Sequence, residues 1–134
     1  MTTTHNSPSR DLTSLGVNDA LRLCEQTTDI DTILALTHHP APSVRKRALV
    51  EMCPCRVQED LSEFWERVFE MISDEDANVR YQVLHTLCDG SPAHLELRVA
   101  EALDTFNRDP DPKIRRKAHQ CLTSYWRKGK WNIM

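Results

Sequence analysis

The sequence predicts an all-α fold built from three similar helical pairs. An apolar-Arg pair recurs three times at intervals of 35 residues, as Val44-Arg45, Val79-Arg80 and Ile114-Arg115. Further apolar residues follow each pair at the spacing of one helix face. The chain also has only three glycines in 134 residues, too few for an all-β fold with many tight turns.

Each repeat unit contains two apolar stripes, one for each helix of the pair. The stripe of the second helix continues four and eight residues after the apolar-Arg pair, at Ala48, Met52, Val83, Leu87, Ala118 and Leu122. The same interval aligns the stripe of the first helix, which comprises Ile30, Ile33, Leu36, Trp65, Val68, Met71, Ala100, Leu103 and Phe106. Because both stripes repeat without a gap, we expect the units to stack on one continuous core.

The predicted elements follow in chain order. Residues 1–15 are expected to form a flexible tail, and a cap helix is expected over 18–26. Three helical pairs come next, at 29–37 with 42–53, 58–72 with 77–87, and 92–107 with 112–126. They lie in repeats of about 29–57, 58–91 and 92–127, and a tail at 128–134 ends the domain of residues 16–134. The segments "CPCRV" and "CDGS" are the predicted breaks between units.

The connectors within the pairs contain start signals for the second helices. Asp76 and Asp111 stand at N-cap positions, where a carboxylate accepts from free backbone N–H groups. Pro42 and Pro112 stand at the first helical position, where the missing N–H has little effect. Ala41 cannot cap the second helix of the first unit.

Two helices per unit, a 35-residue period and an acidic turn before an apolar-Arg pair resemble HEAT repeats over about Asp29 to Trp126. That family has an Asp five positions before the apolar residue, matched by Asp74 and Asp109 but replaced by His39 in the first unit. The resemblance implies a short right-handed α-solenoid with an N-terminal cap helix. It also implies a ladder between successive units, formed by Arg45, Arg80 and Arg115 with the turn carboxylates of Asp74 and Asp109.

Composition excludes several classes of partner and compartment. The formal net charge is −3 and the pI about 6.0, so the chain as a whole lacks the charge of a nucleic-acid-binding or membrane-surface protein. No apolar run is long enough for a membrane span, and the N-terminus lacks the apolar core of a secretory signal. We therefore expect a cytoplasmic protein whose five cysteines are reduced.

The second helices contain the residues that we expect to bind a partner. Equivalent side chains on successive second helices form a stripe along one surface of a solenoid. The predicted set is Lys46, Arg47, Tyr81, His85, Arg116, Lys117 and Gln120. Because basic residues dominate this set, we expect a protein–protein interaction module for an acidic or phosphorylated partner. The alternative is weak, sequence-independent nucleic-acid binding along the same stripe.

A third alternative is a small thiol- or metal-dependent enzyme. Cys53 and Cys55 form half of a zinc-like motif, and His85, Cys88, His119 and Cys121 follow later in the chain. Cys53 and Cys88 are separated by one repeat, however, so they should lie too far apart to share a metal. His85 and Cys88 have no third group to orient them, and no glycine-rich phosphate loop is present. We expect no enzyme activity, metal or cofactor.

The C-terminal end contains a group of apolar residues: Trp126, Trp131, Ile133 and Met134. A terminal repeat exposes an apolar flank unless something covers it. We expect this group to fold back over the last helical pair. The alternative is a contact surface for a partner or for a second copy of the chain.

Overall fold

The computed structural model describes residues 11–52 and 62–129, and within them it contains seven α-helices and no strand. The predicted all-α class is confirmed for this part of the chain. The helices are α1 (Val17–Gln26), α2 (Ile30–Leu36), α3 (Pro42–Glu51), α4 (Ser62–Glu70), α5 (Ala77–Gly90), α6 (Glu96–Phe106) and α7 (Pro112–Lys128). Three short 3-10 turns accompany them: η2 (Leu12–Ser14), η3 (Met71–Ser73) and η4 (Ala93–Leu95). Among these helices, none has the length and hydropathy that crossing a membrane requires.

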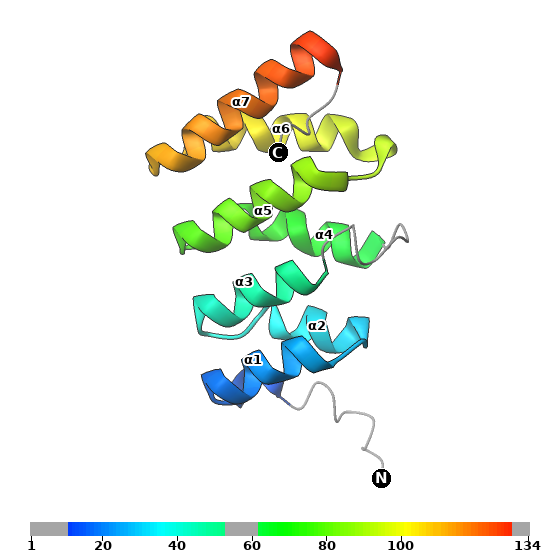
Figure 1. Ribbon diagram of the computed structural model, residues 1–134, viewed down its shortest axis with the longest axis vertical. Helices are drawn as coiled ribbons and strands as arrows, with labels where there is room; N and C mark the ends of the chain where they lie inside the picture. Colours follow the sequence, from blue (N-terminus) through cyan, green and yellow to red (C-terminus); the bar gives the residue numbers. More distant parts are fainter. Residues whose placement is uncertain (1–10, 53–61, 130–134) are drawn as a thin grey trace.

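The helices form two rows along the long axis of the molecule. Helices α1, α3, α5 and α7 lie one above another in one row, and α2, α4 and α6 lie behind them (Figure 1). Each of α2, α4 and α6 packs against the helix that follows it in the chain. The chain therefore advances from the N-terminal end of the stack to the C-terminal end one helical pair at a time.

Backbone N–H groups at the start of several helices are satisfied by aspartate side chains. Asp29 is the N-cap of α2, and Asp76 and Asp111 are the N-caps of α5 and α7. Each carboxylate accepts from one or two backbone N–H groups of the first turn, which would otherwise lack a partner. Helix α3 has Ala41 at this position and no side-chain cap, and Pro42 begins it.

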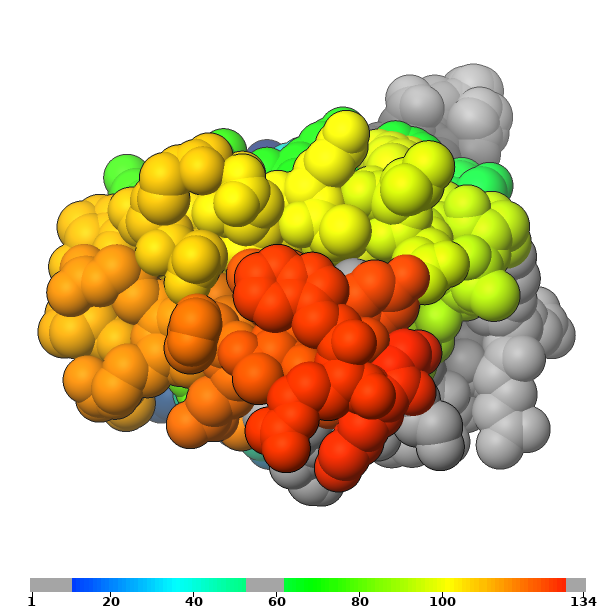
Figure 2. Space-filling model, turned by 90° about the horizontal axis from the view of Figure 1, so that it is seen from above, coloured from blue at the N-terminus to red at the C-terminus, as the bar shows by residue number. Residues whose placement is uncertain are grey.

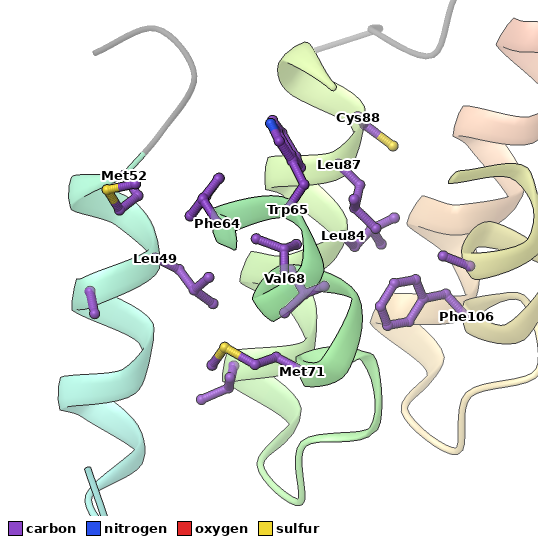
Figure 3. Close-up of a cluster of buried hydrophobic side chains, with 14 of the residues drawn as sticks. Leu49, Met52, Phe64, Trp65, Val68, Met71, Leu84, Leu87, Cys88 and Phe106 are labelled. Carbon is purple, nitrogen blue, oxygen red and sulfur yellow. The ribbon is translucent and has the colours of Figure 1, made fainter. Parts of the chain in front are cut away.

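The apolar stripes of the repeat meet between the two rows. Val44, Val79 and Ile114 are buried, as are the residues four and eight positions later in each helix. Figure 3 shows how Leu49 and Met52 on α3 face Phe64, Val68 and Met71 from α4 and η3. Each pair shares its apolar surface with its neighbours, so the core runs through the stack without interruption.

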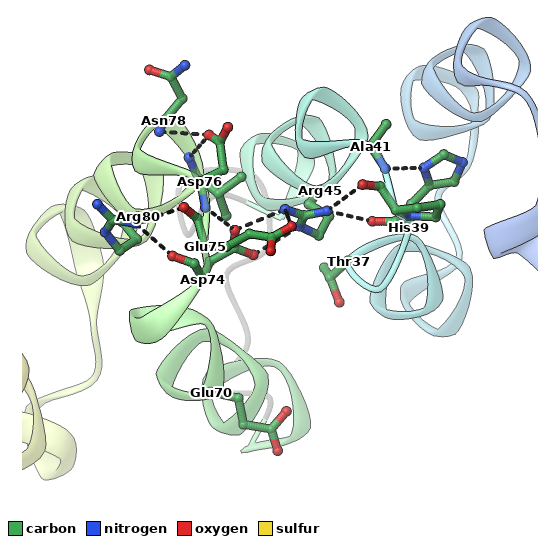
Figure 4. A network of polar contacts seen from close by, with 12 residues as sticks. Thr37, His39, Ala41, Arg45, Glu70, Asp74, Glu75, Asp76, Asn78 and Arg80 are labelled. Atoms are coloured by element: carbon green, nitrogen blue, oxygen red, sulfur yellow. Dashed lines mark hydrogen bonds and ion pairs between the residues drawn. The ribbon is translucent and has the colours of Figure 1, made fainter.

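Arg45 and Arg80 join successive pairs through the turns. Arg45 donates from Nε and Nη2 to the two carboxylate oxygens of Asp74, at 2.9 and 3.0 Å (Figure 4). Arg80 contacts Asp109 with the same two atoms, at 2.8 and 3.1 Å. In both arginines, Nη1 donates to two backbone carbonyls in the turn of its own unit. One guanidinium thus fixes the shape of its own turn and the position of the next.

His39 stands in the first turn at the position that Asp74 and Asp109 occupy in the other two turns, and its imidazole takes the place of their carboxylates. Its Nδ1 accepts from the Ala41 N–H at 3.0 Å, and its Nε2 lies 2.8 Å from the Leu15 carbonyl oxygen. Because Nδ1 accepts, the proton must be on Nε2, which donates to Leu15. A neutral donor is suitable here because the joint with α1 offers a carbonyl in place of a guanidinium.

The structure corrects three predicted boundaries. Residues 11–15, predicted as part of the tail, contain η2, and Leu12 and Leu15 pack against the core. The predicted break at "CDGS" begins only at Ser91, because α5 continues to Gly90 and buries Cys88 against its neighbours. The third pair begins with the turn η4, so α6 starts at Glu96 rather than at 92. The predicted break "CPCRV" and the tail at 1–10 lie outside the described residues.

Replacing Arg45 with Ala should destabilise the fold far more than replacing Arg115 with Ala. Arg45 and Asp74 side chains are each only 9% exposed, so the substitution removes both guanidinium donors from a buried carboxylate and one donor from each of two carbonyls. We expect Arg45→Ala to reduce the free energy of unfolding by about 3–5 kcal/mol. Arg115 contacts only two carbonyls at the surface, so Arg115→Ala should reduce it by about 1 kcal/mol or less. Urea unfolding followed by circular dichroism measures both, and equal losses would contradict the structural role of the Arg45–Asp74 pair.

Replacing His39 with the aspartate that the other two turns have at this position should weaken the fold. An aspartate could still accept from Ala41, but it cannot donate to the Leu15 carbonyl, and it would place a charge in a site that is 2% exposed. We expect His39→Asp to reduce the free energy of unfolding by about 1–3 kcal/mol. Thermal and urea denaturation at neutral pH check this, and a gain in stability would show that the first joint accommodates a charged turn.

Candidate functional site

The outer side of α3, α5 and α7 carries the predicted binding residues at equivalent positions of the repeat. Lys46, Tyr81 and Arg116 are spaced by 35 residues along the chain. Because the three helices lie side by side, such residues point to the same side of the molecule. We call this surface the second-helix face, comprising Lys46, Val50, Tyr81, His85, Arg116, Lys117 and Gln120.

Three cations of the second-helix face have no carboxylate partner among the described residues. Lys46 and Arg116 are exposed and Lys117 is half-buried, and none of them forms an ion pair there. Lys46 lies on α3, and Arg116 and Lys117 lie on α7. The face therefore carries unneutralised positive charge at two separate levels.

Arg47 was predicted to belong to this surface, but it has a structural role. Its Nε donates to Glu51 at 2.8 Å, and its Nη2 lies 3.4 Å from a carboxylate oxygen of Glu25 on α1. The guanidinium thus connects α3 to the first helix of the row. The repeat pattern does not reveal this pairing, because Glu25 belongs to a helix outside the three repeated pairs.

Uncharged and weakly polar side chains lie between the cations. Tyr81 and His85 are half-buried on α5, and the ammonium of Lys113 lies 5.8 Å from the centre of the Tyr81 ring. This distance allows a cation–π contact between α7 and the Tyr81 ring. Val50, at the position equivalent to His85, is 37% exposed and adds apolar surface. The 35-residue period alone could have placed Val50 on this surface. It was not predicted because the residues were chosen mainly for their charge.

Shallow hollows on the surface adjoin the C-terminal end of this face. One hollow of about 390 Å³ is lined by Asn107, Arg115, Arg116, His119 and Gln120. A neighbouring one of about 400 Å³ extends along α7 and is lined by His119, Gln120, Thr123, Ser124, Arg127 and Lys128. Both are open and lined mainly by polar and basic side chains. They suit a charged side chain of a partner better than an enclosed apolar ligand.

The described thiols are part of the core. Cys24, Cys88 and Cys121 are free and buried. Burial raises the pKa of Cys24, and a hydrogen bond with Cys121 together with burial raises the pKa of Cys88 well above that of a free thiol. Accepting that bond lowers the pKa of Cys121, but its side chain is fully covered. None of the three combines a thiolate with access to a substrate.

The described residues contain no cluster of three or more His, Cys, Asp or Glu side chains placed to hold a metal ion. His85 and Cys88 lie on α5 one turn apart, and His119 and Cys121 lie on α7. Cys53 and Cys55 of the zinc-like motif are outside the part of the chain that the structure describes, as are Trp131, Ile133 and Met134. Trp126, the first of the C-terminal apolar residues, is 69% exposed.

Comparisons of the chain with protein-family models, with curated proteins and with solved structures found no match.

The three described thiols should react slowly with an alkylating reagent while the protein is folded. Because Cys24, Cys88 and Cys121 are covered, modification requires local opening of the stack. We expect iodoacetamide to label them at least about 100-fold more slowly in buffer than in about 6 M urea. Peptide mass spectrometry quantifies each cysteine separately. Rapid labelling of Cys121 in the folded protein would instead indicate a reactive thiol.

Proposed function

We propose that the chain is a short α-solenoid of three HEAT-like helical pairs that binds an acidic or phosphorylated protein surface, without catalysing a reaction. The 35-residue period, the two rows of helices and the guanidinium bridges between turns support this architecture. Among the described residues, α3 contacts mainly α1, α2 and α5, and α7 contacts mainly α5 and α6, which is typical of a repeat array. Such arrays present an extended surface and commonly serve as binding modules.

One observation carries the proposed partner chemistry: the unneutralised cations of the second-helix face. Most other arginines of the described chain are already engaged, Arg45 and Arg80 with turn aspartates and Arg67 with Glu70 and Thr37. Lys46, Arg116 and Lys117 have no such partner among the described residues. Exposed cations without partners attract an oppositely charged surface and set the rate and specificity of its binding.

The side chains around these cations favour a protein partner. Tyr81 offers an aromatic ring in contact with the Lys113 ammonium, and Val50 and His85 offer apolar and amphipathic surface on the same face. Tyr is enriched among the residues that contribute most of the binding free energy of protein interfaces. A surface that is partly apolar and partly basic suits a folded or peptide partner with carboxylates or phosphates. A nucleic-acid backbone requires a longer line of cations, and the pairing of Arg47 with Glu25 and Glu51 interrupts that line.

Reversing the charge of Arg116 should weaken the binding of an acidic peptide. The assay is a fluorescence-anisotropy titration with a Glu-rich peptide of about ten residues, its phosphoserine counterpart and a single-stranded oligonucleotide of similar charge. We expect Arg116→Glu to weaken peptide binding by about tenfold, and an increase from about 50 to 200 mM salt to weaken it further. The control is Arg108→Glu, which reverses an exposed arginine that lies in the connector between α6 and α7 and is paired with Asp104 rather than unneutralised.

Two outcomes would contradict this function. Equal effects of Arg116→Glu and Arg108→Glu would show that net charge, rather than the second-helix face, controls binding. A clear preference for the oligonucleotide over both peptides would identify a nucleic-acid-binding protein instead.

A further inference from the structure

Arg115 is held like the other two arginines of the repeat, but its outer edge has no acceptor among the described residues. Its Nη1 donates to the carbonyls of Asp109 and Pro110, at 2.7 and 3.1 Å. The same atom of Arg45 and Arg80 makes the equivalent pair of bonds. In those two residues, Nε and Nη2 then bind one aspartate of the next unit. In Arg115 this Nε–Nη2 edge is exposed at the end of the stack.

The surface around Arg115 is polar where the inner units are apolar. Leu49 and Leu84 are buried between units, whereas the equivalent residue of α7 is the exposed His119. His119 and Asn107 are among the residues that line the hollow of about 390 Å³ beside the Arg115 guanidinium. Figure 2 looks onto this end of the molecule, where side chains of α6 and α7 form the visible surface. Arg115 thus offers a preorganised fork for a carboxylate.

The opposite end of the stack presents an exposed carboxylate ahead of its first helix. Asp11 precedes η2 and lies six residues before α1, whereas Asp74 and Asp109 each lie three residues before α5 and α7. Its Oδ1 accepts from the Thr13 hydroxyl at 2.8 Å, which leaves the carboxylate at the surface of this end. The Asp11 side chain is exposed and forms no ion pair with a described residue.

The N-terminal end of the stack is acidic and the C-terminal end is basic. Residues 11–31, at the N-terminal end, contain five carboxylates and one arginine. Residues 111–128, which include all of α7, contain six lysines and arginines and one carboxylate. Two copies of the chain placed end to end would bring these opposite charges together, whereas any arrangement of like ends would oppose them.

From these observations we propose that copies of this chain associate head to tail, with Arg115 of one copy binding Asp11 of the next. Helix α1 of the second copy then lies on α7 of the first, as α3, α5 and α7 each lie on the preceding helix of their row. The contact is heterologous, so it extends into open chains of copies rather than closing into a symmetric dimer. Because polar residues such as His119 line it, the association depends on charge and is sensitive to salt. This inference uses the ends of the stack, and it meets the second-helix face only at its C-terminal end, where Arg116 and Gln120 line the same hollow as Arg115.

Two complementary variants test the contact. Asp11→Ala removes the acceptor of the N-terminal end, and Arg115→Ala removes the donor of the C-terminal end, and neither substitution introduces a new charge that could pair with the other variant. Sedimentation velocity at about 20 mM salt, with chain concentrations up to about 1 mM, covers dissociation constants from micromolar to millimolar. We expect the unaltered protein to form dimers and longer species, and each variant alone to remain monomeric. An equimolar mixture should give only a 1:1 dimer, because one compatible pair of ends remains.

The mixture also shows that both variants are folded, since only correctly folded ends can pair. Lys46→Glu lies on α3, away from both ends of the stack. It should leave self-association unchanged while it weakens the binding of the acidic peptide. Failure of the proposed binding function and failure of head-to-tail association are therefore distinguishable.

Three results would overturn the proposal: a monomeric unaltered protein, a mixture that stays monomeric, or self-association that survives either end variant. An increase to about 300 mM salt should weaken the association at least about tenfold, and no change would also overturn it.

Discussion

The fold depends on a chain of contacts that passes from turn to turn: Arg45, Asp74, Arg80, Asp109 and Arg115. Each turn aspartate binds the arginine of the preceding unit through its carboxylate, and its backbone carbonyl accepts from the arginine of its own unit. The same groups therefore set both the shape of a turn and the spacing between units. Since the second helices begin directly after these turns, the direction of each helix, and hence the surface that it presents, follows from this network.

The N-terminal joint uses different chemistry for the same purpose. A neutral imidazole, that of His39, replaces the carboxylate and donates to the Leu15 carbonyl. Two further contacts support the first pair from outside the turns: Arg47 reaches Glu25 on α1, and Arg67 on α4 donates to the carbonyl and hydroxyl of Thr37. Several arginines of the described chain thus stabilise the scaffold, whereas Lys46, Arg116 and Lys117 form no ion pair with a described residue.

Sequence reasoning was most informative where a contact is repeated. Helix positions, buried stripes and N-caps follow from a 35-residue period, because the same packing must be satisfied in every unit. Contacts made once leave no such pattern. Neither the pairing of Arg47 with Glu25 nor the bond from His39 to Leu15 could be found from the period, since both partners lie before the first repeat. Local composition indicated a break at "CDGS", but α5 continues through Gly90 and Cys88 is buried.

The constant spacing of the turn contacts bears on how such a chain can change in length. Arg45 and Asp74 are 29 residues apart, as are Arg80 and Asp109. Each bridge therefore lies within one repeat length, and a duplicated unit would bring both halves of a new bridge with it. Loss of a whole unit would likewise leave the neighbouring turns able to pair. Growth or shortening by whole units preserves the joints, whereas an insertion of a few residues between an arginine and its aspartate displaces one partner from the other.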